Sequence, residues 1–441
     1  MKILSSRTST MKITSSILLF SFLFLSVIDA QNPPPAKPQQ EPILIMNATA
    51  HLGNGTVIPN AAIGFENGKL TLVADATRIR IDKNHYTRVI DGVGKHIYPG
   101  IIACNTLLGI SEIDAVRSTR DVYEVGDFNP NVRTIIAYST DSKIIPTLRS
   151  NGILLAQVIP LGGTIPGQSS VVELDGWNWE DAAYKMDDGV QLYWPRMYIP
   201  KTNEPDKDEQ QRQRMMQQID AIEAFLKEAK SYSMEKSPAE KNLKLEAMKG
   251  LFDGKKKLYV HCGFAKEIIA AVNMSKKYGI DMVLVEGYDA WRVADFLHAN
   301  NIAVILNRIH SLPPREDDDV DLPYRIPAIL KQAGVVYTMS MGGSWPNRNV
   351  MFNAGTSAAY GLTKEEALTS ITLNPAKILG IDSTVGSLEV GKDATLFISS
   401  GDILDMKTCN VETAFIRGKD INLDNVQKQL YRKYMDRYGL K

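Results

Sequence analysis

The sequence predicts an α/β fold: a (β/α)8 barrel of the TIM type, with a discontinuous small β-sandwich formed by both ends of the chain. Three observations predict it. Strand and helix patterns alternate through the middle of the chain, and short strand-and-turn segments stand before and after that middle. The chain has 441 residues, of which 44% are hydrophobic, so it can bury a large core.

The first segment, residues 1–30, has the pattern of a secretory signal peptide. Lys2, Arg7 and Lys12 precede the apolar run "ITSSILLFSFLFLSVI", and a Pro-rich linker follows over residues 31–42. We therefore expect a secreted protein, periplasmic or extracellular, with no integral membrane segment after cleavage. An uncleaved membrane anchor is the alternative, although the run is short for a full span.

Two β segments bracket the middle of the chain. Residues 43–98 give short strands divided by Gly-Asn-Gly and Glu-Asn-Gly turns, and residues 384–421 repeat that strand-and-turn pattern far along the chain. The spacing predicts that both segments join in one discontinuous sandwich.

Residues 99–383 are predicted to form the barrel. Four apolar strands are each followed by a helical pattern: "LYVH", "MVLVEG", "IAVILNR" and "VVYTMS". The last helix, "LTKEEALTSITLNPAKILG", opens with a capping box of Thr363 and Glu366. Such alternation predicts a parallel sheet with right-handed crossovers, and the length of the region suits eight strands.

Two charged segments fall outside this pattern. Residues 200–250 predict a charged helical insert, either an outer or lid helix or a partner-binding surface. Residues 422–441 predict a basic amphipathic helix that packs on the body, with membrane contact as the alternative.

Charge and cysteine content exclude several classes of protein. The 50 basic and 50 acidic residues balance, so no broad surface attracts nucleic acid. The acidic run at 317–319 predicts a solvated loop more than a cation site. The cysteines, Cys104, Cys262 and Cys409, form no disulfide framework; a Cys104–Cys262 bridge is one alternative, and two buried thiols are the other.

Functional groups of a parallel barrel lie at the carboxyl ends of its strands. The strands end at these polar residues: Asn105, His261, Glu286, Asn307, Arg308 and Ser340, with His310 just beyond Arg308. Of six histidines, only His261 and His310 are expected to reach this rim. Counting alone therefore excludes a multi-histidine metal site. His261 has a second interpretation, as a hydrogen-bonded core histidine.

Several stretches resemble the amidohydrolase superfamily, in its imidazolonepropionase-like and prolidase-like branch. They are "HIYPGIIACNTLLG", "LYVHCGFAKEI", "EGYDAWRVADFL", "RIHSLPPREDDDVDLPYRIPAIL" and "NRNVMFNAGTSAAYGLTKEEALTSITLNPAKILGI" followed by "GSLEVGKDATLFI". The resemblance runs from about residue 43 to residue 421. It implies a hydrolase that acts on C–N bonds, in amides or peptides, with a two-metal centre at the rim.

The chain departs from the family pattern at the implied metal ligands. Asn105 and Leu107 stand at the first two histidine positions, and Ala103 at the preceding aspartate. Gln191 and Arg196 lie near the place of the bridging ligand. His261 is kept, Glu286 replaces the next histidine, and "MSMGGS" lacks the final aspartate.

What the resemblance implies is therefore a degenerate metal site. His261 and Glu286 are the candidate metal ligands and catalytic residues, for one weakly bound divalent metal such as zinc or, more in keeping with the pattern, none. Glu112 and Asp114 could contribute if their loop folds inward. Asn105, Arg196, Arg308 and His310 are candidate substrate-binding residues, since arginine suits a carboxylate.

Three functions stay open. The protein is a C–N hydrolase with an unusual or metal-free mechanism, a catalytically inactive pseudoenzyme that binds a small molecule or peptide, or an accessory scaffold. No nucleic acid partner is expected. A homo-oligomer is an open alternative.

Overall fold

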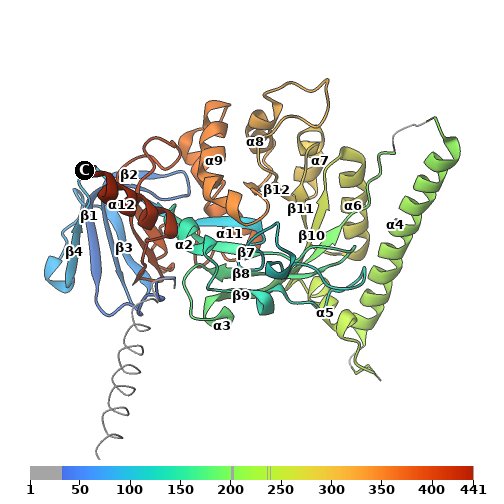
Figure 1. The fold of residues 1–441 in the computed structure, drawn as a ribbon, viewed down its shortest axis with the longest axis horizontal. Coiled ribbons are helices and arrows are strands. Elements are labelled where there is room, and N and C mark those ends of the chain that lie inside the picture. Colours follow the sequence, from blue (N-terminus) through green and yellow to red (C-terminus); the bar gives the residue numbers. More distant parts are fainter. Residues whose placement is uncertain (1–31, 200–202, 236, 239, 441) are drawn as a thin grey trace, which may run out of the picture. The chain divides into compact units, whose positions relative to one another are not determined.

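Two eight-stranded sheets organise the computed structural model of this protein (Figure 1). The structure describes residues 32–199, 203–235, 237–238 and 240–440. The predicted signal peptide lies outside the described residues. The chain from residue 34 onward forms one unit that contains both sheets.

The barrel sheet runs in the order β13-β12-β11-β10-β9-β8-β7-β6. Its strands are β6 (Ile101–Thr106), β7 (Ile153–Val158), β8 (Gly167–Glu173), β9 (Ala183–Tyr193), β10 (Lys257–Cys262), β11 (Met282–Glu286), β12 (Ala303–Leu306) and β13 (Tyr337–Met339). The first and last strands approach each other, since Leu107 N donates to Gly343 O at 3.0 Å. The sheet is therefore a nearly closed barrel.

The prediction of an all-parallel barrel is correct for β9 to β13 and for β6 with β7, but wrong for β8. Strand β8 runs antiparallel to both β7 and β9. Only residues 159–166 join β7 to β8, and a parallel crossover needs about a dozen residues or more. The short connection therefore produces a hairpin, where an all-parallel barrel would need a βαβ crossover.

Helices cover the parallel half as predicted (Figure 1). They are α6 (Ala265–Tyr278), α7 (Ala294–Ala299), α8 (Leu322–Gln332) and α9 (Val350–Ala359). The predicted last helix is two helices, α10 (Lys364–Thr369) and α11 (Leu373–Leu379). Pro375 sits in the first turn of α11, where proline is tolerated, so the helix restarts there.

The predicted capping box is confirmed. Thr363 Oγ1 accepts from Glu366 N at 3.2 Å, and Thr363 N donates to the Glu366 carboxylate at 2.9 Å. This reciprocal pair begins α10 at the residue that the sequence indicated.

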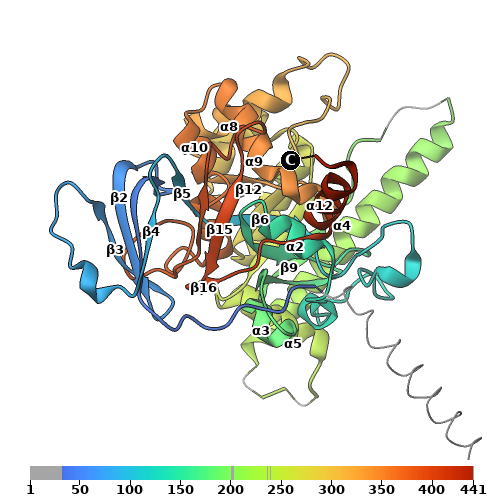
Figure 2. The ribbon, with the colours of Figure 1, turned by 60° about the vertical axis from the view of Figure 1, so that its left-hand side comes forward.

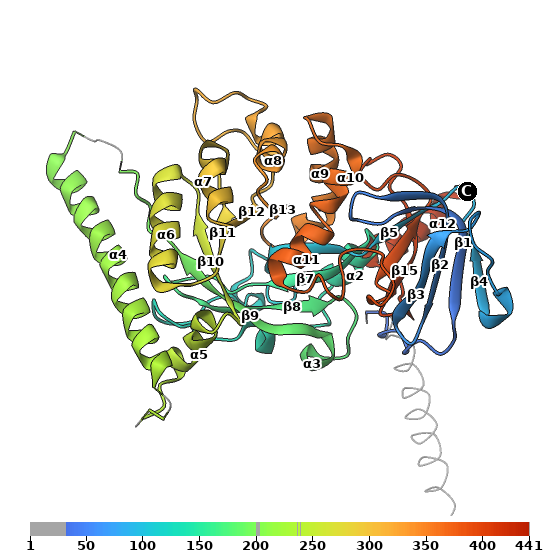
Figure 3. The same cartoon turned by 180° about the vertical axis from the view of Figure 1, so that it is seen from behind.

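The charged insert forms α4 (Pro205–Met234) and α5 (Leu243–Phe252). The buried side chains of α4 form one stripe in its second half: Ile222, Leu226, Ala229 and Tyr232. There it packs beside α6, where Lys230 Nζ donates to Tyr278 O at 3.0 Å. The first half of α4 extends past α6 (Figures 1 and 3).

The second sheet combines both ends of the chain (Figure 2). Its strands are β1 (Ile43–His51), β2 (Val57–Glu66), β3 (Lys69–Asp75), β4 (Arg88–Asp91), β5 (His96–Pro99), β14 (Leu396–Ser399), β15 (Val411–Ile416) and β16 (Lys419–Asp420). Strand β14 pairs antiparallel with β5, which joins the two ends. The ring centroids of Phe65 on β2 and Phe415 on β15 lie 5.0 Å apart, although three strands separate β2 from β15 in the sheet order. The sheet therefore curls around its own core.

The last helix, α12 (Val426–Tyr438), buries none of its residues. It is held at its start, where Asn425 Nδ2 donates to Ser150 Oγ at 2.9 Å and Thr147 Oγ1 donates to Gln427 Oε1 at 2.8 Å. Within the described residues, no helix is both long enough and apolar enough to cross a bilayer.

The described part of the Pro-rich segment lies against the body. Ala36 N donates to Asp175 Oδ2 at 3.0 Å, and Gln39 bonds to Phe65 O and Gly68 N. These bonds connect the segment to both the barrel and the second sheet.

Candidate functional site

His261 lies at the end of β10, inside the barrel, with 5% of its surface exposed. Its Nε2 lies 2.9 Å from Gln191 Oε1, and its ring stacks on Tyr193 at 4.1 Å between centroids. An amide oxygen only accepts, so Nε2 carries the proton. Burial lowers the pKa of His261 to about 3, so the imidazole is neutral at pH 7.

A chain of hydrogen bonds continues from His261 across the barrel interior. Gln191 Nε2 donates to Ser169 Oγ at 2.9 Å. Gln157 Nε2 and the Tyr259 hydroxyl both donate to Asp188 Oδ2, at 3.0 and 2.7 Å. Burial raises the pKa of Asp188. The strand ends are therefore joined by amides and hydroxyls around one buried carboxyl group.

The network includes residues that sequence reasoning missed: Gln157, Ser169, Asp188 and Tyr259. A signal exists in "DDGVQLY" of β9, where the polar residues Asp188 and Gln191 stand beside Val190 and Leu192. The family resemblance gives a role only to Gln191, near the place of a bridging ligand. Gln157 and Ser169 lie on β7 and β8, where the antiparallel hairpin had not been predicted.

Asn105 joins the first strand to the last. It adopts a left-handed φ of 57°, which asparagine tolerates better than most residues. Its Nδ2 donates to Ser340 Oγ at 3.4 Å, and its backbone N donates to Gln157 Oε1 at 3.2 Å. Leu107, two residues on, packs against the hydrophobic core.

Glu286 lies in a hollow between the ends of β11 and β12 and helix α8. Its φ of 80° is left-handed, which interrupts the alternation of β11 at this position. Burial, and then the charge of Glu267, raises the pKa of Glu286. Arg308 lines the same hollow, with an apolar wall from these residues: Leu306, Ile309, Pro313, Leu322 and Ile326.

The remaining candidates lie elsewhere. Arg196 is exposed, with its guanidinium 5.6 Å from the centre of the Phe264 ring. His310 is exposed and shares a hydrogen bond of 2.7 Å with Thr356 Oγ1. The structure therefore brings Asn105 into contact with the barrel network that ends at His261, and Glu286 together with Arg308, but does not gather all six residues.

The loop carboxylates of Glu112 and Asp114 accept hydrogen bonds from neighbouring groups. Glu112 accepts from Ser142 Oγ at 2.5 Å and from Lys143 N at 2.8 Å. Asp114 is exposed and accepts from Ser111 Oγ at 2.8 Å.

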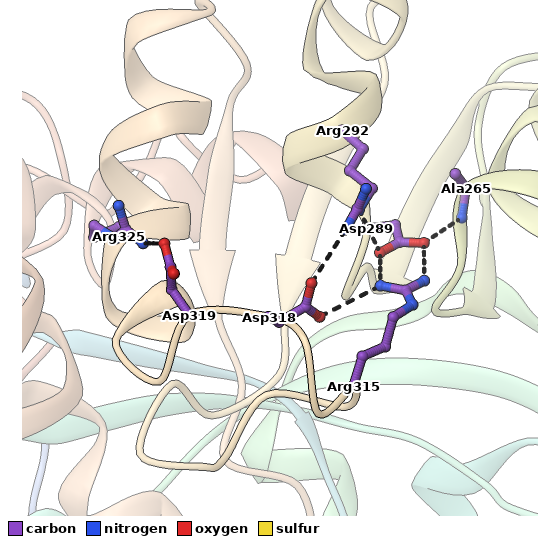
Figure 4. A network of polar contacts seen from close by, with 7 residues as sticks. All are labelled: Ala265, Asp289, Arg292, Arg315, Asp318, Asp319 and Arg325. Carbon is purple, nitrogen blue, oxygen red and sulfur yellow. Dashed lines mark hydrogen bonds and ion pairs between the residues drawn. The ribbon is translucent and has the colours of Figure 1, made fainter.

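An ionic network ties the loop after β12 to the rim (Figure 4). Arg315 bonds both oxygens of the Asp289 carboxylate, at 2.8 and 2.7 Å, and reaches Asp318 at 3.5 Å. Arg292 bonds Asp318 at 3.1 Å. The prediction of a solvated loop at 317–319 is therefore wrong for Asp318, whose side chain is 5% exposed because two arginines surround it.

A family model, the amidohydrolase family, matches residues 178–421, which is more than half of the chain. The chain belongs to the amidohydrolase family. This agrees with the barrel and with the motifs at the ends of its strands.

Individual relatives of this amidohydrolase-family protein match less of the chain. An imidazolonepropionase from Shewanella putrefaciens is 48% identical over 71 residues, which are 15% of this chain and 17% of that protein. A second, from Shewanella oneidensis, is 45% identical over 71 residues, with the same coverage. The alignment thus spans about a sixth of these relatives.

Solved structures match most of the chain. An amidohydrolase from Thermotoga maritima MSB8 has a TM-score of 0.74 at 23% identity, over 86% of this chain and 99% of that one. A Xaa-Pro dipeptidase with bound methionine in its active site has a TM-score of 0.54 at 13% identity, over 86% and 100%. At these identities the likeness is one of fold.

Members of this superfamily are expected to hold metal at the strand ends, where a metal ion needs imidazole, carboxylate or thiolate donors. Leu107 offers no donor atom, Asn105 a neutral amide, and the His261 Nε2 proton points to Gln191. In the described part of the chain, no group of three or more His, Cys, Asp or Glu side chains could hold a metal ion. Cys104 and Cys262 are buried free thiols, so the alternative bridge does not form. These donors do not fit a divalent cation, which needs about four nitrogen, oxygen or sulfur ligands.

Proposed function

We propose that this amidohydrolase-family protein binds a small organic molecule or peptide at its barrel mouth, and that it does not carry out metal-assisted hydrolysis of C–N bonds. One observation carries the proposal. The polar groups of the barrel interior form one hydrogen-bonded chain. Asn105 N donates to Gln157, Gln157 and Gln191 both donate to Ser169 Oγ, and His261 is bonded to Gln191. The chain consists of amides, a hydroxyl and a neutral imidazole, whereas metal-assisted hydrolysis needs a Lewis acid beside the carbonyl.

The hollow beside Glu286 is the proposed ligand site. It is mostly apolar, as ligand pockets usually are, and it has a few polar groups that could orient a ligand: Glu286, Asn307 and Arg308. Arg308 is exposed and could bind a carboxylate with both N–H arms. The degenerate metal site proposed here means that His261 supports the barrel and that Glu286 meets the ligand.

A metal-free hydrolase of amide or peptide bonds is the second candidate. The observation that favours it is the raised pKa of Glu286, because a carboxyl group with a raised pKa at a hollow is suited to general acid–base catalysis. The names of the similar proteins, imidazolonepropionase and Xaa-Pro dipeptidase, suggest C–N bonds as the target. His261 would have to act as the acid, and burial with a pKa of about 3 opposes that role.

We also propose that the protein is exported. The charged start and apolar run of residues 1–30 support this, and the periplasm or the extracellular space would be its location. A homo-oligomer or a scaffold role for the α4 region remains compatible with the proposed function.

The test combines metal analysis with an activity assay. The purified full chain is equilibrated with zinc, manganese or cobalt, dialysed, and analysed for bound metal. It is then assayed on dipeptides and cyclic amides. We expect well under one metal per chain and no hydrolysis. Stoichiometric metal that is lost in His261→Ala, together with hydrolysis, would overturn the proposal.

The Glu286→Gln variant separates the two candidates. If the wild-type protein hydrolyses an amide without bound metal, and Glu286→Gln abolishes that activity while His310→Gln keeps it, the metal-free hydrolase replaces the binding protein. His310 is the matched control because it is an exposed rim residue outside the hollow.

A further inference from the structure

A second cavity, of about 720 Å³, lies on the same rim but outside the barrel. Its walls are the segment that follows β9, residues 196–199, the first half of α4 and the start of α6. Each of these rim segments follows the carboxyl end of a parallel strand, where barrels place their binding groups. The long insert helix α4, which passes beside α6, supplies the outer wall (Figure 1).

The two carboxylates that line this cavity are already satisfied. Glu267 accepts three backbone N–H groups, from Met197 at 2.9 Å and from Gly263 and Phe264 at 3.2 Å each. Asp289 is bonded by Arg315 and by Ala265 N (Figure 4). These bonds also fix the floor of the cavity, because they tie the segment after β9 and the loop after β12 to the start of α6.

In contrast, several basic side chains around the cavity form no ion pair with a described residue. Within the residues that the structure describes, Arg196 and Lys266 form no ion pair, and neither does Arg214, which lines an adjoining hollow together with Arg196. Arg212 is paired with Glu209 at 2.8 Å. Four basic side chains (Arg196, Arg212, Lys266 and Arg315) and two acidic ones (Glu267 and Asp289) line the cavity, which therefore carries an excess of positive charge.

Apolar and polarisable groups complete the lining. Arg196 and Arg315 lie 5.6 and 5.1 Å from the centre of the Phe264 ring. Tyr198 and Met216 line the cavity and are 64% and 54% exposed, so both side chains are accessible to a molecule bound there. Methionine and aromatic groups adapt to apolar ligands of different shape.

We propose that this cavity binds an organic anion: a carboxylate attached to an apolar or aromatic body. Arg196 binds the carboxylate, Lys266 and Arg214 add to its attraction, and the body packs between Phe264 and the methionines of α4. This inference does not rest on the proposed function, since it concerns a cavity other than the hollow that holds Glu286 and Arg308.

The test uses two probes that differ only in charge. N-acetyl-phenylalanine carries a carboxylate, and N-acetyl-phenylalaninamide carries the same body without it. Calorimetric titration of the full chain should detect binding of the acid at millimolar concentration or below, and at least about 10-fold weaker binding of the amide. Arg196→Gln should weaken binding of the acid by at least about 10-fold.

Arg78→Gln is the matched control, because it removes an 83% exposed arginine that lies outside both hollows. It should leave the affinity unchanged. Equal affinity for acid and amide, no binding of the acid by the wild-type protein, or loss of binding in Arg78→Gln with none in Arg196→Gln would each overturn the proposal. A correctly folded Arg196→Gln variant is verified by its unfolding midpoint.

Discussion

The barrel interior and the junction between the barrel and the second sheet bury polar groups with different kinds of partner. The junction places buried carboxyl groups beside arginines: Arg149 and Asp175, both buried, pair at 2.6 Å, and the exposed Arg417 pairs with the buried Glu173 at 2.6 Å. The interior uses neutral amides and hydroxyls around Asp188, whose pKa is raised. Buried charge persists only where a counter-charge lies beside it. The comparison teaches that the buried carboxyl groups of the junction lie beside arginines, whereas the buried Asp188 of the interior lies beside neutral donors.

The largest effect is expected at the junction. Arg149→Leu would leave Asp175, whose side chain is 0% exposed, without its closest ion-pair partner. Breaking a buried pair from one side costs about 3–5 kcal/mol, so the free energy of unfolding should fall by that amount in urea denaturation. Arg78→Leu, which removes an 83% exposed partner of Asp75, should change it little.

A smaller loss for Arg149→Leu than for Arg78→Leu would contradict the view that the junction depends on paired charges. Lys419, which lies 3.7 Å from Asp175, would then be the group that compensates for the loss of Arg149.

The interior should respond to acid through His261. The folded pKa of about 3 lies below the value of about 6.5 expected in the unfolded chain. The folded state therefore binds fewer protons than the unfolded state. The contribution of the neutral His261 to the free energy of unfolding is complete above pH 6.5 and is lost as the pH falls toward 3. Between pH 7 and pH 4 the loss is about 3 kcal/mol.

The measurement compares the wild-type protein with His261→Asn by urea denaturation at both pH values. Carboxylates titrate in both proteins, so the difference between them isolates the histidine. A wild-type protein that loses no more stability than the variant would show that His261 is protonated, or accessible to protons, in the folded state.

A next smaller effect is expected for the hydrogen-bond network itself. Gln191→Leu removes the acceptor of His261 Nε2 and the donor to Ser169 Oγ, which leaves buried polar groups without partners. The free energy of unfolding should fall by about 2 kcal/mol. Gln213→Leu, on the exposed face of α4, is the control and should be near neutral. An equally small effect at Gln191 would mean that water replaces its bonds.

The smallest effect is expected at the rim. His310 is exposed and has one side-chain hydrogen bond, to Thr356. His310→Ala should change stability by no more than about 0.5 kcal/mol, since exposed substitutions rarely do more. Thr356→Val, which removes the other partner, should match it. A loss above that range would indicate that His310 supports the loop that carries Arg308.

Local patterns predicted much of the fold. The capping box at Thr363 depends on residues three positions apart, and the strands that end at His261 and Glu286 are marked by their own apolar runs. Two similar β segments at the two ends of the chain predicted that these ends would join, and the structure joins them by pairing β5 with β14. In contrast, the direction of β8 depended on the length of one loop and was predicted incorrectly.

The sequence by itself determined which donors this barrel has: a leucine and an asparagine at two expected ligand positions, and two histidines, His261 and His310, near the ends of the parallel strands. Which donor atoms a residue carries is a local property, so the sequence alone is enough to count them. Only the tertiary structure decided what those side chains do. Gln191 is hydrogen-bonded to His261, and Arg196 lines a separate cavity. Both positions depend on which strands and helices pack together. Such contacts join residues far apart along the chain, and no local pattern specifies them.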